Sequence, residues 1–134
     1  MVLESLNNKA EQDKLLDLVG RILEIKEDGI TSEKKVENIA FYCPLHPGQK
    51  VMPGTLICEA LAQVCARFLF IKFNEVKPML VGFNKVWFKK AVFGGDVIRI
   101  SARLVKQKGK ACFFIGNVFV QNNLVSKAEI IFFK

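Results

Sequence analysis

Residues 55–73 read TLICEALAQVCARFLFIKF and contain neither proline nor glycine. On a helix of about five turns, the apolar side chains of this stretch point in nearly every direction. These side chains are Leu56, Ile57, Ala60, Leu61, Val64, Cys65 and Phe68. A helix that is apolar all round is typical of a protein core, and Pro53 suits its first turn. The sequence therefore predicts one long buried helix.

Two segments before this helix carry strong turn signals. Residues 21–27 alternate apolar and charged side chains, and Asp28-Gly29 then precedes residues 30–41. This pattern predicts a β-hairpin with a solvated outer face. Residues 44–54, PLHPGQKVMPG, hold three of the four prolines. We expect an ordered loop there, because proline interrupts both helices and central strands.

The last third of the chain changes to a period of two, which is typical of strands. Residues 97–105, VIRISARLV, alternate cleanly, and similar runs cover 80–93, 111–121 and 124–133. Short turns between these runs predict a four-stranded antiparallel meander. The fold class is therefore α+β, with a long buried central helix wrapped by a curved antiparallel β-sheet. Residues 1–14 are expected to form a flexible polar tail before a single domain.

Charge is distributed unevenly along the 134 residues. The net charge is +7, but residues 1–40 hold six basic and nine acidic side chains, whereas the remainder holds 14 basic and four acidic ones. A basic body favours an anionic partner. No uninterrupted apolar run reaches the ~18 residues of a membrane span, and the N-terminus lacks the apolar region of a signal peptide. We expect a cytoplasmic protein.

The four cysteines form no C-x-x-C pair, and the single histidine is not at metal-ligand spacing from them. A structural zinc site needs about four ligands, so we expect no metal. Free and mostly buried thiols are the expected state of these cysteines in a reducing compartment.

Glu59 is the only charged residue between Pro53 and Ala66. Burying an unpaired carboxylate costs several kcal/mol, so this glutamate needs a reason to be there. Gln63 lies four residues on, on the same helix face, and can hydrogen-bond to it. Glu59 is therefore either a rim residue held by Gln63 and loop amides, or a catalytic or ligand-orienting acid.

Two motifs resemble one enzyme family. LHPGQKVMPGTLICEALAQ (45–63) resembles the signature of the β-hydroxyacyl-acyl-carrier-protein dehydratases, with 47–48, 51–54, Leu56 and 59–63 in register. GFNKVWFKKAVFGGD (82–96) resembles a second motif of that family. The resemblance runs from about residue 15 to residue 134, which is the expected domain, and it implies the hot-dog fold. Degenerate hot-dog proteins associated with bacterial flagellar genes are a further resemblance.

The resemblance also implies a site at a homodimer interface, where a histidine and a glutamate act together beside a ligand tunnel. Glu59 occupies the position of the glutamate, but Leu45 occupies the position of the histidine. His46 follows one place later and is a second candidate base. The implied substrate-binding residues are Leu45, Pro53, Gly54, Leu56, Gln63, Gly82, Phe83, Lys85, Lys89 and Lys90.

Three hypotheses follow from these residues. In the first, the dimer binds acyl-CoA or acyl-carrier protein without dehydrating it, in a sensing or regulatory role. In the second, it is an enzyme, either a dehydratase that uses His46 or a thioesterase that uses Glu59. The third and least favoured is nucleic-acid binding through lysine clusters near Trp87. No cofactor is expected; acyl-CoA or acyl-phosphopantetheine is the expected ligand.

Overall fold

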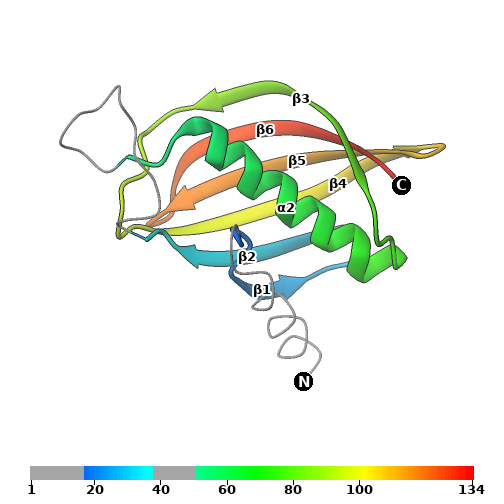
Figure 1. Ribbon diagram of the computed structural model, residues 1–134, viewed down its shortest axis with the longest axis horizontal. Coiled ribbons are helices and arrows are strands. Elements are labelled where there is room, and N and C mark those ends of the chain that lie inside the picture. Colours follow the sequence, from blue (N-terminus) through cyan, green and yellow to red (C-terminus); the bar gives the residue numbers. More distant parts are fainter. Residues whose placement is uncertain (1–16, 38–50) are drawn as a thin grey trace.

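The computed structural model describes residues 17–37 and 51–134. Within these residues, one helix lies across one face of a six-stranded antiparallel sheet (Figure 1). The strands are β1 (Arg21–Ile25), β2 (Gly29–Lys35), β3 (Met79–Phe88), β4 (Val97–Lys108), β5 (Ala111–Val120) and β6 (Asn123–Phe133), and the helix is α2 (Gly54–Phe73). The predicted α+β class, with a long central helix against an antiparallel sheet, is confirmed. The expected tail, residues 1–14, lies outside the described residues, as do residues 38–41 at the end of the predicted hairpin and residues 44–50 of the proline-rich loop.

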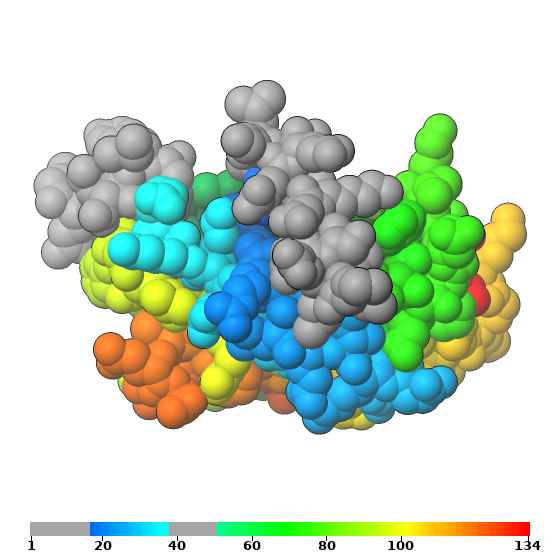
Figure 2. Space-filling model, turned by 90° about the horizontal axis from the view of Figure 1, so that it is seen from below, coloured from blue at the N-terminus to red at the C-terminus, as the bar shows by residue number. Residues whose placement is uncertain are grey.

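The predicted N-terminal hairpin is present. β1 pairs with β2 so that Ile25 faces Ile30, and the N–H of Lys26 donates to the carbonyl oxygen of Gly29 at 2.7 Å to close the turn. This hairpin, in blue and cyan, lies on the face of the molecule seen from below in Figure 2. Its strand β1 forms one edge of the sheet, and β3 forms the opposite edge.

The predicted four-stranded meander is wrong in one respect. The order of strands is β1-β2-β4-β5-β6-β3, so β3 pairs with β6 rather than with β4. The connection after β3 is not a tight turn but a crossing segment. The N–H of Met52 donates to the carbonyl oxygen of Val92, and the N–H of Val36 donates to the carbonyl oxygen of Asp96, both at 2.8 Å. After this segment, β4 pairs with β2, so that Lys35 faces Val97. β3 pairs instead with the last strand, β6.

The core lies between α2 and the sheet. Eight of the 20 residues of α2 are buried, and they pack against the alternate residues of β4, β5 and β6 that face the helix. The ring of Phe68 meets that of Phe114 edge to face, with centroids 5.9 Å apart. The helix approaches the sheet closely at Gly116, where an added Cβ would lie 2.6 Å from Cδ2 of Leu61. The sequence prediction of a buried helix is confirmed.

By length and composition alone, α2 meets the criteria for a membrane-spanning helix, with a mean hydropathy of 1.6 over its most apolar window. In the sequence, Glu59 and Arg67 interrupt the apolar run of this helix. The packing decides the matter, because one face of the helix, with Leu61, Phe68 and Leu69 on it, is buried against the sheet. α2 is therefore the core helix.

Candidate functional site

Glu59 lies in the second turn of α2 and is half-buried. The side-chain amide of Gln63 donates from Nε2 to Oε2 of Glu59 at 3.0 Å, as the four-residue spacing predicted. The other end of the same amide is also engaged, because Oε1 of Gln63 accepts the backbone N–H of Leu18 at 2.8 Å. A chain of hydrogen bonds thus runs from the segment before β1 to the acid on the helix.

The N-terminal end of α2 begins at the predicted Pro-Gly turn. Pro53 is the N-cap residue and offers no side-chain cap; its carbonyl oxygen accepts the N–H groups of Leu56 and Ile57 at 3.0 and 3.2 Å. Gly54 lies against the ring of Phe88 from β3, so that an added Cβ would be 2.9 Å from Cζ of that ring. Leu56 is partly buried and packs against the core. The structure therefore brings the predicted residues 53, 54 and 56 together with Glu59 at one end of the helix.

Three of the predicted binding residues lie on the edge strand β3. Phe83 is partly buried against the core, opposite Ile130. Gly82 faces open space, because no atom lies within 4 Å of the position of its missing Cβ. Lys85 has a positive φ of 52° at an irregularity in the strand.

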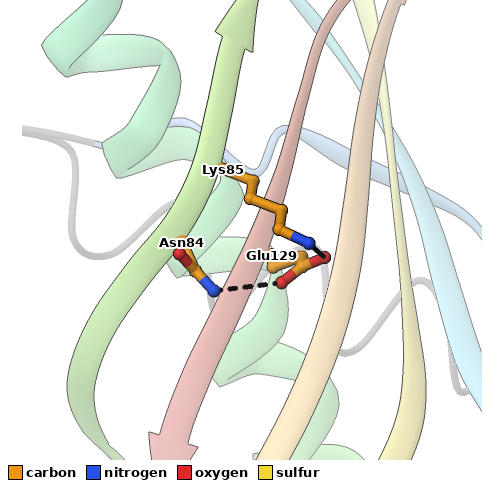
Figure 3. A network of polar contacts seen from close by, with 3 residues as sticks. All are labelled: Asn84, Lys85 and Glu129. Atoms are coloured by element: carbon orange, nitrogen blue, oxygen red, sulfur yellow. Dashed lines mark hydrogen bonds and ion pairs between the residues drawn. The ribbon is translucent and has the colours of Figure 1, made fainter.

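Lys85 is paired with an acid rather than directed to the helix terminus. Its Nζ lies 3.9 Å from Oε2 of Glu129, and Nδ2 of Asn84 donates to Oε1 of the same carboxylate at 3.3 Å (Figure 3). The side chain of Lys85 is 68% exposed, so this pair contributes little to stability.

Lys89 and Lys90 follow Phe88 and are exposed. Their backbone N–H groups both donate to the carbonyl oxygen of Val125, at 2.8 and 3.3 Å. The main chain is therefore fixed, and the two ammonium groups remain available beside the strand end whose ring covers Gly54.

The remaining candidates fall into two groups. Leu45 and His46 lie outside the described residues. Among residues 17–37 and 51–134, no three His, Cys, Asp or Glu side chains gather closely enough to hold a metal ion. Cys65 and Cys112 are buried and Cys58 is half-buried, and all three are free thiols. Burial raises the pKa of each of these thiols, which makes them poor nucleophiles.

A surface cavity of about 340 Å³ lies away from this site, between the start of β4 and the β5–β6 turn. Arg99 lines it and donates from Nη2 to Oδ1 of Asn122 at 2.8 Å, with its guanidinium 5.5 Å from the centroid of Phe119. None of the residues predicted for the site lines this cavity.

Sequence reasoning missed two participants at the site. Leu18 contributes only its backbone N–H, which no side-chain pattern reveals, and Phe88 contacts Gly54 through the tertiary fold. Arg67 lies further along α2. Its Nη1 is buried and has no hydrogen-bond partner within the described part of the chain.

Comparison with known proteins identifies the family. A FabA-like domain matches residues 11–129. The chain belongs to the FabA-like family. Over 119 residues, which are 86% of this chain and 83% of the relative, it is 37% identical to the 3-hydroxyacyl-(acyl-carrier-protein) dehydratase FabZ of Moorella thermoacetica.

Solved structures show that the fold of this FabA-like chain is the hot-dog fold expected from its motifs. Thioesterase superfamily member 2 of zebrafish has a TM-score of 0.78 at 15% identity, covering 96% of this chain and 95% of its own. A hypothetical thioesterase with coenzyme A from Streptococcus pneumoniae has a TM-score of 0.72 at 18% identity, covering 84% and 86%. At these identities the likeness establishes the fold alone. The FabA-like chain is thus a dehydratase-like hot-dog protein.

Proposed function

We propose that this chain is a cytoplasmic bacterial protein that binds fatty acyl thioesters as a hot-dog homodimer and does not dehydrate them, in a sensing or regulatory role. The observation that carries the proposal is that only one residue of the catalytic pair of the dehydratases is present. The acid Glu59 is kept and held by Gln63 at 3.0 Å, whereas Leu45 stands where the dehydratases have their histidine.

Loss of the histidine removes a proton-transfer step that the other residues do not replace. A general base contributes about 10²–10⁴-fold to a reaction rate, and an acid and base that act as a unit lose most of their effect when either is removed. A leucine side chain carries no transferable proton. An acyl thioester would therefore be bound and oriented at Glu59 without losing water.

Charge and position support a thioester ligand. The body of the chain beyond residue 40 carries a net +10, which suits the phosphates of coenzyme A or an acidic carrier protein. Lys89 and Lys90 expose ammonium groups just after Phe88, whose ring lies over Gly54. The helix terminus at Gly54 offers backbone N–H groups of the kind that bind a carbonyl oxygen or an anion.

The edge strand β3 supports the dimer. Met79, Leu80 and Val81 on this strand are 61%, 41% and 47% exposed, and a free edge with apolar side chains is a template for pairing with another strand. Pairing with the same strand of a second copy would cover these side chains and place a ligand tunnel at the interface, next to α2.

The proposal is tested by ligand binding and by restoring the missing histidine. Purified protein is expected to gain thermal stability with acyl-CoA or acyl-carrier protein of some chain length, and to show no hydration of enoyl-CoA. Leu45→His is expected to give measurable hydration, and Glu59→Gln in that background is expected to abolish it. Absence of any thermal shift across chain lengths, together with no co-purified thioester, would sink the binding role.

Thioester hydrolysis is the second candidate, because Glu59 is an oriented carboxylate and a single carboxylate can serve as nucleophile or as base for water. Acyl-CoA hydrolysis by the unmodified chain, lost in Glu59→Gln, would favour this function over binding alone. Hydration of enoyl-CoA by the unmodified chain, lost when His46 is replaced, would instead show a dehydratase that uses His46. Binding to nucleic acid is not favoured; a sequence preference that persists at high salt would be needed to support it.

A further inference from the structure

Two hydrogen bonds of the Gln63 side chain determine which end of its amide carries the oxygen. A backbone N–H can only donate, so the atom that faces Leu18 at 2.8 Å must be the oxygen Oε1. Nε2 is then the atom that faces Glu59, and it must donate to Oε2 at 3.0 Å. The assignment of oxygen and nitrogen in this amide therefore follows from its hydrogen-bond partners.

This orientation constrains the carboxyl group of Glu59. Oε2 is the oxygen that accepts the amide hydrogen bond. Within the described residues, Oε1 is the oxygen left to bind a ligand group. The two oxygens of Glu59 therefore differ: Oε2 is hydrogen-bonded to Gln63, and Oε1 is the working oxygen that would face a ligand.

The position of the Leu18 N–H depends on the chain path before β1. The N–H of Val19 donates to Oδ1 of Asp17 at 3.1 Å, and Gly20 adopts a φ of +69°. A Cβ at residue 20 would collide with the carbonyl oxygen of Glu33 and lie 2.9 Å from Cβ of Lys34. Only glycine combines this left-handed conformation with so close an approach to β2, so Gly20 holds the segment against the sheet.

We infer that Gln63 is a positioning residue for Glu59 rather than a substrate-binding residue, and that the backbone N–H of Leu18, held in place by Gly20, sets its orientation. The effect of this orientation on ligand binding rests on the proposed function, in which Oε1 of Glu59 faces the thioester. The hydrogen-bond geometry itself does not depend on any ligand. Displacement of residues 17–20 would break the hydrogen bond between Leu18 and Gln63 and so loosen the amide that holds Glu59.

The geometric part is tested by NMR on the ¹⁵N-labelled full-length protein. The side-chain amide resonances of Gln63 are assigned by their loss in Gln63→Leu. They are expected to shift in Leu18→Pro, which removes the backbone N–H of residue 18. They are expected to stay in place in the matched control Leu18→Ala, which keeps that N–H. Exchange of the Leu18 amide proton is expected to be about three- to tenfold faster in Gln63→Leu. Unchanged exchange in that variant would overturn the inference.

A second pair of variants covers the case in which proline at residue 18 prevents folding. Gly20→Ala is expected to shift the Gln63 resonances. Gly109→Ala provides the same backbone strain, with a φ of +59° and no atom within 4 Å of the new Cβ, and is expected to leave them unchanged. Equal effects of the two alanine variants would contradict the role of Gly20.

The functional part is tested by affinity for acyl-CoA. Gln63→Leu is expected to weaken binding about as much as Glu59→Gln, and the two changes together are expected to weaken it no further, because they act through one group. In the exchanged variant Glu59→Gln/Gln63→Glu, the Leu18 bond is kept but the carboxylate has moved, so slow exchange of Leu18 with weak binding is expected. Full affinity in Gln63→Leu would overturn the positioning role. If the unmodified chain does not bind at all, the proposed function fails and the NMR results still decide the geometry.

Discussion

The ring of Phe88 lies directly against Gly54, with Cζ only 2.9 Å from the place that a Cβ on residue 54 would occupy. One residue is the first of the central helix and the other is the last of the edge strand β3. Because Phe88 is 50% exposed, its ring can move when the contact changes. The ring therefore packs on the helix terminus at which we expect the thioester carbonyl to bind.

Gly54→Ala is expected to displace the ring of Phe88. We expect a loss of about 1 kcal/mol in the free energy of unfolding, since the overlap involves the far end of a mobile side chain rather than backbone. The same change in a Phe88→Ala background is expected to be neutral or stabilising, because alanine is the better helix former. Urea unfolding of the four proteins in a double-mutant cycle measures the coupling, and an additive cycle would contradict the contact.

Gly116→Ala is expected to be more costly, because Leu61 and Ile130 confine the site from both sides, at 2.6 and 3.0 Å from the new Cβ. Both side chains are fully buried, so overpacking should lower the free energy of unfolding by about 1–3 kcal/mol. Leu61→Ala alone should cost about 2–5 kcal/mol. The double variant should lose less than the sum, since the new methyl group occupies part of the cavity; chemical denaturation at 25 °C provides the comparison.

Val81→Lys is expected to weaken the proposed dimer. Val81 lies on the edge strand β3 and is 47% exposed, and a lysine there would place two like charges across a paired edge. Val105→Lys is the matched control, because Val105 is 41% exposed and lies on β4, away from that edge. Light scattering over a concentration series should show a shift to monomer in the first variant only. A monomeric parent chain would remove the basis of this prediction and of the interface tunnel.

The stability of the protein is expected to fall in alkaline solution through its buried thiols. Burial raises the pKa of Cys65 far above its ordinary value of 9.0. The unfolded chain therefore releases this proton at a lower pH than the folded chain, and the stabilisation is present below about pH 9 and lost as the pH rises above it. Between pH 8 and pH 9.5 the unmodified protein should lose about 1 kcal/mol more than Cys65→Ala. Equal losses by urea unfolding would show that Cys65 does not contribute.

The sequence predicted the elements whose signals are local. The helix 55–73 differs from α2 by one residue, because its apolar side chains lie within it and its Pro-Gly start directly precedes it. The hairpin at Asp28-Gly29 and the alternation of residues 97–105 were likewise recovered, and so was the bond between Glu59 and Gln63, four residues apart on one helix.

Interactions between distant segments could not be read in the same way. The pairing of β3 with β6 rather than β4 depends on a crossing segment that bonds to Val36 and Met52, and no pattern within β3 encodes its neighbour. Leu18 and Gln63 are 45 residues apart, and the donor is a backbone group that every residue except proline possesses.

The sequence alone thus determined that this chain builds a buried helix bearing one acid, in a FabA-like framework that has leucine where its relatives' motif has histidine. Only the tertiary structure decided which oxygen of that acid is held, which ring covers Gly54, and which strand is left at the edge. Local periodicity and side-chain chemistry are properties of short segments, whereas these three relationships arise from backbone groups and surfaces that meet only when the whole sheet has closed around the helix.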